Sequence, residues 1–375
     1  MTTTVALQKC SEYNFDDVYK SIQELLKLVP PPDVKGKTVL LKPNILYPKK
    51  PELAVCTHPV VVGACVKCFV EMGATVIVGE SPAIANSLSA AKSTGMYEQV
   101  VNNGGEWVEF NKHIVVPCEN GKVAVQFNFA EPFARADVVV SLSKLKSHQL
   151  MTYTGAMKNL FGLVVGLEKA QCHYRFDDKK DFAAFLIDLN ISAKASYAIM
   201  DAIVGMDGPG GPGSGDPIKL GFLAASDNLL ALDWECSSLV GYNPHKIVYL
   251  EDALDRGIWL KSPHDIKTVG VPESEVRNSN FKIVKDPSPN LQRMLPPFLS
   301  FLAKKVFVKT PHFIPEKCMK CGRCVQICPV HKIELKGKNG TATLEEKDAC
   351  LHCFCCHEIC PYSAIKLKRF SSLIF

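Results

Sequence analysis

The chain has 375 residues, 47% hydrophobic and 22% charged, enough to bury a core and form two or three domains. Its net charge of +5 is too small for a nucleic-acid-binding stripe. Its apolar runs are far shorter than the roughly 20 residues that cross a bilayer, so we expect no transmembrane segment. No basic region followed by an apolar stretch opens the chain, so we expect a cytoplasmic protein whose 16 cysteines are metal ligands or reduced thiols.

The first 250 residues alternate between strand-like and helix-like segments, which is typical of an α/β domain with a mainly parallel sheet. We expect helices over Phe15–Val29, over His58–Met72 with Thr57 as its N-cap, and over Leu88–Asn102. Strands are expected at Thr38–Leu41, Thr75–Val78, Trp107–Phe110, Val123–Phe127 and Asp137–Ser141.

The next part of the chain is less regular. Phe182–Ala198 is predicted to be helical or mixed, Gly205–Pro217 to be a long loop, and Asn228–Val240 to be a helix that ends at Gly241. Residues 261–310 are interpreted as a return segment and a linker. Within them, Pro296–Val308 is predicted to be a helix packed between two domains, with a membrane-surface helix as the alternative.

Nine cysteines gather near the C-terminus in two copies of one motif. Cys318, Cys321, Cys324 and Cys328 precede Pro329, and Cys350, Cys353, Cys356 and Cys360 precede Pro361. Both copies match C-x2-C-x2-C-x3-C-P, a spacing for 4Fe-4S clusters in which the fourth cysteine binds the cluster of the other copy. We therefore predict two 4Fe-4S clusters, one held by Cys318, Cys321, Cys324 and Cys360 and the other by Cys350, Cys353, Cys356 and Cys328.

Two zinc sites or free thiols are the alternative, but structural zinc sites commonly use paired C-x2-C knuckles. Cys355 is a spare thiol inside the second motif. Residues 311–375 resemble the two-cluster bacterial ferredoxins, which implies a compact pseudo-symmetric module of β-hairpins and short helices. The ten basic and six acidic residues of this segment would offset the negative charge of the clusters.

Polar stretches follow the predicted strands at four places, where open α/β sheets bind ligands. They are residues 42–44, 80–82, 141–173 and 200–217. If the strand at 137–141 continues, Lys144, Lys146 and His148 share one face. The candidate catalytic residues are these three with Asp207, and the candidate substrate-binding residues are Lys42, Asn44, His58, Glu80, Ser81, Lys158, Asn159 and Gly208.

A cationic site beside a glycine-rich loop suits an anionic substrate, whereas the alternative is solvated lysines and glycines that only form turns. Gly208, Gly210 and Gly213 match G-x-G-x-x-G, but the intervening prolines argue against a dinucleotide site. Cys65 and Cys68 are interpreted as core residues. Cys172 and His173 are conceivable ligands or proton donors, with a structural role as the alternative.

The strings LLKPN, THP, ESP, SLSKLKSHQLMTYTGAMKNLFG and DAIVGMDGPG resemble the domain of unknown function 362 family over residues 37–250. The resemblance implies no particular activity. The segment is more distantly similar to the nickel-pincer lactate racemase fold, but we infer no nickel site.

We therefore expect a three-layer α/β domain with a mainly parallel sheet at 1–260, a return segment and linker helix at 261–310, and a small α+β ferredoxin-like domain at 311–375. The leading interpretation is an iron–sulfur electron-transfer protein whose α/β domain docks a redox partner protein. The alternative is a reductase that delivers single electrons to an anionic small molecule, with anaerobic metabolism as the expected setting. A third hypothesis is a binding or assembly module in which the clusters are structural.

Overall fold

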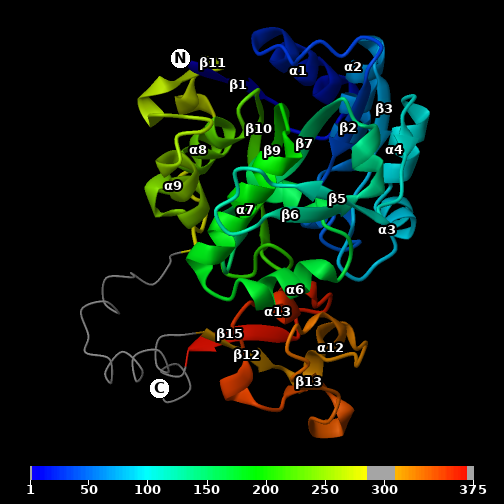
Figure 1. The fold of residues 1–375 in the computed structure, drawn as a ribbon, viewed down its shortest axis with the longest axis vertical. Coiled ribbons are helices and arrows are strands. Elements are labelled where there is room, and N and C mark those ends of the chain that lie inside the picture. Colours follow the sequence, from blue (N-terminus) through cyan, green and yellow to red (C-terminus); the bar gives the residue numbers. More distant parts are fainter. Residues whose placement is uncertain (1, 285–308, 370–375) are drawn as a thin grey trace.

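A computed structural model describes residues 2–284 and 309–369 of the chain. Figure 1 shows a large N-terminal α/β body and a small C-terminal module packed against one end of it. The helix predicted at Pro296–Val308 lies outside the described residues. None of the helices within the described ranges is long and apolar enough to cross a membrane.

The α/β body is built on a nine-stranded sheet with the order β11-β1-β10-β9-β7-β2-β3-β4, and β8 pairs with β7 beside this path. The strands β9, β7, β2, β3 and β4 run parallel to one another, whereas β10 is antiparallel to β9 and β1. The mainly parallel sheet predicted from the sequence is confirmed. Its strands are β1 (Thr3–Lys9), β2 (Thr38–Lys42), β3 (Thr75–Val78), β4 (Glu106–Trp107), β7 (Val138–His148), β8 (Thr152–Thr154), β9 (Tyr197–Asp207), β10 (Asp216–Ser226) and β11 (Ile266–Gly270).

Helices cover both faces of this sheet, which makes three layers (Figure 1). Successive strand residues point to opposite faces, so Val39 and Leu41 of β2 pack on one side and Leu40 on the other. Val39 and Leu41 join a cluster with α1 (Phe15–Leu28), α2 (Pro59–Glu71) and α4 (Met96–Asn102). Leu40 joins a cluster with α7 (Lys179–Ala193), α8 (Leu229–Leu239) and α9 (Val248–Asp255). Strands buried on both faces explain the continuous apolar runs in the sequence.

Some predicted elements differ from those observed. The helix predicted at Leu88–Asn102 is two helices, α3 (Ser87–Ser93) and α4, because Gly95 takes a left-handed φ of 74° between them. His58, not Thr57, caps α2, since its ring accepts a hydrogen bond from the Val60 N–H. The predicted strand at Trp107–Phe110 pairs only as β4, and that at Val123–Phe127 is shifted to β6 (Gln126–Ala130), which pairs with β5 (His113–Pro117).

The central strands are longer than predicted. The strand expected at Asp137–Ser141 continues as β7 to His148, because β2, β9 and β8 pair with it in turn. The segment Phe182–Ala198, predicted to be helical or mixed, contains most of α7 and the first two residues of β9. The long loop predicted at Gly205–Pro217 shrinks to residues 208–215, because β9 and β10 pair as far as Asp207 and Asp216.

The C-terminal module has two similar halves, as the ferredoxin resemblance implied. In it β12 (Lys309–Phe313) pairs with β15 (Ile365–Arg369), and β13 (Ile333–Glu334) pairs with β14 (Thr343–Leu344). Two five-residue helices, α12 (Arg323–Ile327) and α13 (Cys355–Ile359), pack against each other. Each helix contains the third cysteine of one motif, so the two copies of the motif form equivalent parts of the module.

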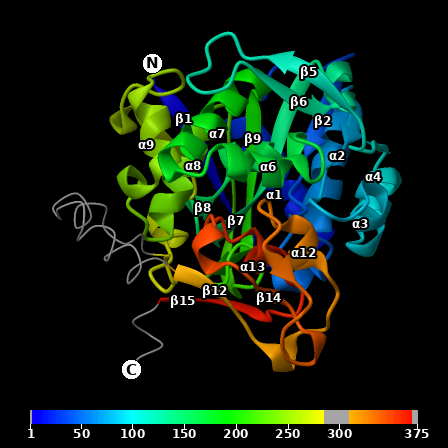
Figure 2. The same ribbon diagram turned by 60° about the horizontal axis from the view of Figure 1, so that its bottom comes forward.

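The module packs where the carboxyl ends of the parallel strands lie (Figure 2). Lys49 Nζ donates a hydrogen bond to the Pro361 carbonyl at 2.7 Å, and Lys309 Nζ donates one to Gln149 at 2.8 Å. The 208–215 loop lies so close to α13 that a Cβ on Gly213 would be 2.1 Å from the Glu358 carbonyl oxygen. Gly213 therefore lets α13 approach the sheet, which gives part of the glycine-rich loop a packing role.

We predict that Gly213→Val loosens this contact, because the new side chain would collide with backbone atoms that cannot rotate away. The expected loss of stability is about 1–3 kcal/mol, as for overpacking elsewhere. Hydrogen exchange measured by mass spectrometry should speed up at α13 and at residues 208–215. Ser214→Ala in the same loop is the control, and equal exchange in the two variants would contradict the prediction.

Candidate functional site

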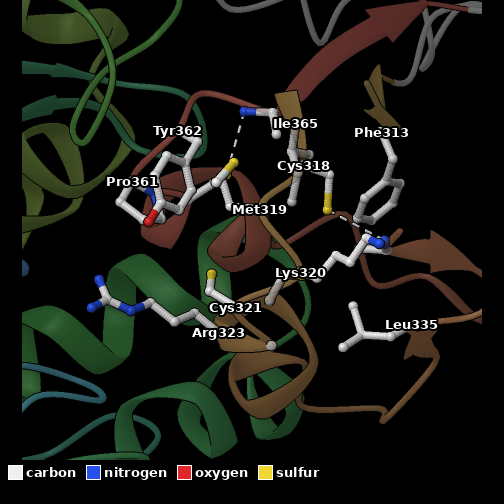
Figure 3. Close-up of a pocket in the computed structure, with 15 residues that line it drawn as sticks. Phe313, Cys318, Met319, Lys320, Cys321, Arg323, Leu335, Pro361, Tyr362 and Ile365 are labelled. Atoms are coloured by element: carbon white, nitrogen blue, oxygen red, sulfur yellow. Dashed lines mark hydrogen bonds between the residues drawn. The ribbon is translucent and has the colours of Figure 1, made fainter. Parts of the chain in front are cut away.

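One cavity of the C-terminal module is lined by four cysteines (Figure 3): Cys318, Cys321, Cys324 and Cys360. The first three come from the first motif and the fourth follows α13. The Ala342 N–H lies 3.5 Å from Cys318 Sγ, and the Ala364 N–H lies 3.3 Å from Cys360 Sγ. Such N–H contacts stabilise thiolates and help to set the potential of an iron–sulfur cluster.

A second cavity gathers the other four motif cysteines: Cys328, Cys350, Cys353 and Cys356. Each cavity thus draws three thiols from one motif and one from the other. In the described ranges, no three or more His, Cys, Asp or Glu side chains are placed to hold a single metal ion. In a 4Fe-4S cube each thiolate binds a different iron, so its ligands surround a body larger than one ion. Both all-sulfur donor sets fit such a cube.

A third cavity, of about 100 Å³, lies between the module and the α/β body, and we call it the interdomain cavity. The module contributes Ile327, Cys355, Glu358 and Ile359 to its wall. The α/β body contributes polar side chains that end or follow β2, follow β3, or lie on α5 (Ala156–Asn159) and α6 (Glu168–Arg175): Lys42, Asn44, Glu80, Ser81, Lys158, Asn159, Lys169 and His173.

Lys42 and Glu80 form a buried ion pair in this wall. Lys42 Nζ also donates to the Pro43 carbonyl at 2.9 Å and to Asn159 Oδ1 at 3.2 Å. Burial lowers the pKa of Lys42 and raises the pKa of Glu80, and each charge opposes the shift of the other. A Cβ on Gly162 would lie 2.2 Å from Glu80 and 2.3 Å from Lys42, so only glycine leaves room for the pair.

Lys158 differs from the other lysines of the wall because its ammonium group has no hydrogen-bond or ion-pair partner among the described residues. Burial lowers its pKa, and Glu358 and then Cys355 are the main groups that oppose this shift. Lys169, in contrast, donates to the Ser81 and Val164 carbonyls, both at 2.7 Å. Lys158 is therefore the cation of the interdomain cavity that is open to a ligand.

Glu358 brings a carboxyl group from α13 into the cavity. Burial raises the pKa of Glu358 to about 7, against the opposing charges of Lys158 and Lys146. Its Oε1 lies 3.5 Å from His148 Nε2. His148 Nδ1 accepts the N–H groups of Leu150 and Met151, which leaves the ring proton on Nε2, facing Glu358.

None of the predicted catalytic residues lines the cavity, although Lys146 and His148 contact residues of its wall, and their catalytic role stays a prediction. Lys144 forms a buried ion pair with Asp201 at 2.8 Å. Lys146 donates to Asn44 Oδ1 at 2.6 Å and so positions a residue of the wall, while burial lowers the pKa of Lys146 to about 7. Asp207 Oδ2 accepts the Lys282 N–H at 2.9 Å.

Two predicted substrate-binding residues also lie outside the wall. His58 stacks on Tyr13 at 3.5 Å between ring centroids, and burial lowers the pKa of His58 to about 4. Gly208 N–H donates to the Lys282 carbonyl at 2.9 Å, and the Gly208 carbonyl accepts the Ser147 hydroxyl at 2.7 Å.

The sequence reasoning missed Glu358 as a site residue and left Cys355 unexplained. When the two motifs are aligned, Cys355 stands where the first copy has Arg323, and Glu358 stands where it has the exposed Gln326. Arginine is usually exposed and cysteine is usually buried. This difference between the two copies indicates that another surface covers the second copy at this position. Lys169 and His173 lie one helical turn apart on α6, a spacing that could have identified them as neighbours.

The fold and the cysteine-lined cavities define an α/β protein with a C-terminal iron–sulfur module, and residues 309–364 match the model of a 4Fe-4S dicluster domain. This match gives the chain iron–sulfur clusters and a role in electron transfer. Residues 39–238 match the domain of unknown function DUF362. The chain belongs to the DUF362 family.

Thylakoid-associated protein sll1697 of Synechocystis sp. is 31% identical over 261 residues, which are 66% of this chain and 77% of that protein. The lactate racemase apoprotein of Thermoanaerobacterium thermosaccharolyticum is similar with a TM-score of 0.40 and 12% identity, over 61% of this chain and 57% of that one. A Thermotoga maritima protein follows with a TM-score of 0.33 and 10% identity, over 53% and 52% of the two chains. The chain thus spans little more than half the length of these two structures.

We predict that Lys42→Met lowers the free energy of unfolding by about 3–5 kcal/mol, because it leaves the Glu80 carboxylate buried without its cation. Urea unfolding measures the loss. The double variant Lys42→Met/Glu80→Gln should recover most of it, since neither charge remains. A double variant no more stable than Lys42→Met would show that the pair does not account for the effect.

Proposed function

We propose that this chain is an iron–sulfur oxidoreductase that receives electrons from a partner protein and passes them singly to a small anionic molecule in the interdomain cavity. One observation carries the proposal. Lys158, which has no partner among the described residues, shares the wall of this cavity with Cys355, which lies between the second-set cysteines Cys353 and Cys356. The anion-binding group and the second cysteine set therefore meet at one place.

We assign a 4Fe-4S cluster to each four-cysteine cavity, with the ligands expected from the motif spacing. When bound, the clusters supply single electrons. The thiols of this chain are all unpaired, as cluster assembly requires, and this supports a cytoplasmic location. We call Cys318, Cys321, Cys324 and Cys360 the outer set, and the Ala342 and Ala364 N–H groups would stabilise two of its thiolates, those of Cys318 and Cys360.

The residues of the cavity wall limit what can bind. A cavity of about 100 Å³ has room for several water molecules, so a small carboxylate or oxoanion fits it. Lys158 would bind the negative charge. The Lys42–Glu80 pair contributes little net charge, and Lys169 is held by carbonyl groups, so these residues shape the wall around Lys158.

The other hypothesis, an electron carrier whose α/β domain docks a partner, has less support. The candidate catalytic residues and the Lys42–Glu80 pair are not available for such docking. Lys42 and Glu80 are buried, and the module covers the cavity that they line. Lys144, Lys146 and His148 are buried as well. These side chains are thus out of reach of an external protein.

We predict that Cys355→Ser retains the full iron content, about eight irons per chain, because Cys355 is not in the assigned ligand sets. Cys353→Ser, two residues away, is the matched control and should lose about half of the iron. Iron analysis with visible absorption spectra measures both. A Cys355→Ser protein with only about four irons would contradict the ligand assignment.

We predict that Lys158→Met abolishes anion binding in the interdomain cavity while the fold stays intact, since Lys158 has no partner to leave unpaired among the described residues. Crystals soaked in sodium bromide should show anomalous density beside Lys158 in the parent protein and none in the variant.

Electron transfer provides the functional readout. Small carboxylates and oxoanions, supplied to the dithionite-reduced protein, should include an acceptor that reoxidises the parent protein at least tenfold faster than Lys158→Met. Ferricyanide should reoxidise both at equal rates. An acceptor reduced equally fast by both proteins would contradict the assignment of the cavity.

A further inference from the structure

Large apolar side chains are exposed around the outer cysteine set. Met319, Leu335 and Tyr362 are 64%, 40% and 47% exposed, and all three line the cavity of that set (Figure 3). Within residues 309–369 they are the large hydrophobic side chains that remain exposed. An apolar patch confined to one edge of a small module is typical of a surface that binds another protein.

Cys321 lies at the same edge and is the exposed member of the eight assigned ligands. In the second set, Cys328 and Cys356 are buried, and Cys350 and Cys353 are partly buried. The outer set is therefore the more accessible to another protein. Cys355, which begins α13 next to Cys356 of the second set, lines the interdomain cavity.

Basic side chains border the apolar patch. Lys317 and Lys320 are exposed on either side of Met319, and Lys320 lines the cavity. Neither forms an ion pair with another described residue, whereas Lys336 beside Leu335 is neutralised by Glu334. Charges act over about 8–10 Å in a salt solution, whereas apolar side chains act only at contact. An approaching protein therefore interacts with these lysines before it reaches the apolar patch. Glu316 is a neighbouring acidic residue. Because Lys317 and Lys320 carry two positive charges against its single negative charge, the border remains cationic.

We propose that Met319, Leu335 and Tyr362, bordered by Lys317 and Lys320, form the docking face for a one-electron carrier protein with an acidic surface. This inference rests on the electron-transfer role proposed above and adds the chemistry of the partner. At each encounter the carrier is oxidised by one electron and the module is reduced by one. Transient complexes between redox proteins bury little surface, often below about 1,200 Å². A patch of three apolar side chains with a charged border is therefore sufficient.

Binding and reduction by a flavodoxin of strongly acidic surface test this proposal on the full-length holoprotein. Calorimetry with oxidised flavodoxin should show weaker binding by about tenfold or more in Lys317→Glu/Lys320→Glu, and the affinity of the parent protein should fall as salt is added. Stopped-flow reduction by flavodoxin hydroquinone should slow to a similar degree, whereas dithionite should reduce both proteins equally.

Lys20→Glu/Lys112→Glu, a pair of exposed lysines on the α/β body, is the matched control and should bind as the parent does. Lys317→Gln/Lys320→Gln, which only removes charge, should weaken binding less, by about threefold, and Leu335→Asp should also weaken it. Unchanged flavodoxin affinity in the Glu and Asp face variants, or equal weakening in the control, would overturn the proposal. Lys158→Met should bind flavodoxin normally, so a failure of the cavity and a failure of the docking face are distinguishable.

Discussion

The approach of α13 to the carboxyl edge of the sheet is the constraint on which the rest of the structure depends. Gly213 allows the loop after β9 to touch the Glu358 carbonyl, and this contact brings Cys355 and Glu358 opposite the polar ends of β2 and β3. Without it, the interdomain cavity would lose one wall. An edge where open α/β sheets usually bind their ligands is here closed by a module that carries redox chemistry.

Closing this edge buries many charged groups, and the structure compensates most of them. A buried ammonium group is costly unless it is paired or hydrogen-bonded. Lys42 has Glu80, Lys144 has Asp201, and Lys146 has the oxygens of Asn44 and Val55. Lys158 lacks such a partner among the described residues, although Glu358 lies near enough to affect its pKa. A cation without such a partner, in the wall of a cavity, is what an anion-binding site requires.

The sequence predicted most of what depends on local pattern. Apolar runs identified β2 and β3, and cysteine spacing sorted the eight thiols into the two sets that line separate cavities. It did not predict β1, β9 or β10, because their pairing joins segments distant in the chain. The glycines at 208–215 suggested an anion-binding loop, whereas the contact of Gly213 with α13 depends on how two bodies pack.

The position of a lysine in a predicted strand does not show whether its ammonium group is available to a ligand. Lys144 and Lys146 follow the alternating pattern of β7, but their partners come from elsewhere, Asp201 from within β9 and Asn44 from the segment after β2. Nothing in the sequence around Glu358 indicated that it lines a cavity, because the residues that surround its carboxyl group belong to the α/β body. Such properties arise from tertiary contacts between segments that are far apart in the sequence.

Anomalous scattering at the iron edge, from crystals of the holoprotein, tests the central claim most directly. The account predicts two four-iron peaks, one among Cys318, Cys321, Cys324 and Cys360, and the other among Cys328, Cys350, Cys353 and Cys356 next to the interdomain cavity. A single peak, scattering from zinc, or a second cluster separated from Lys158 by a displaced module would contradict it.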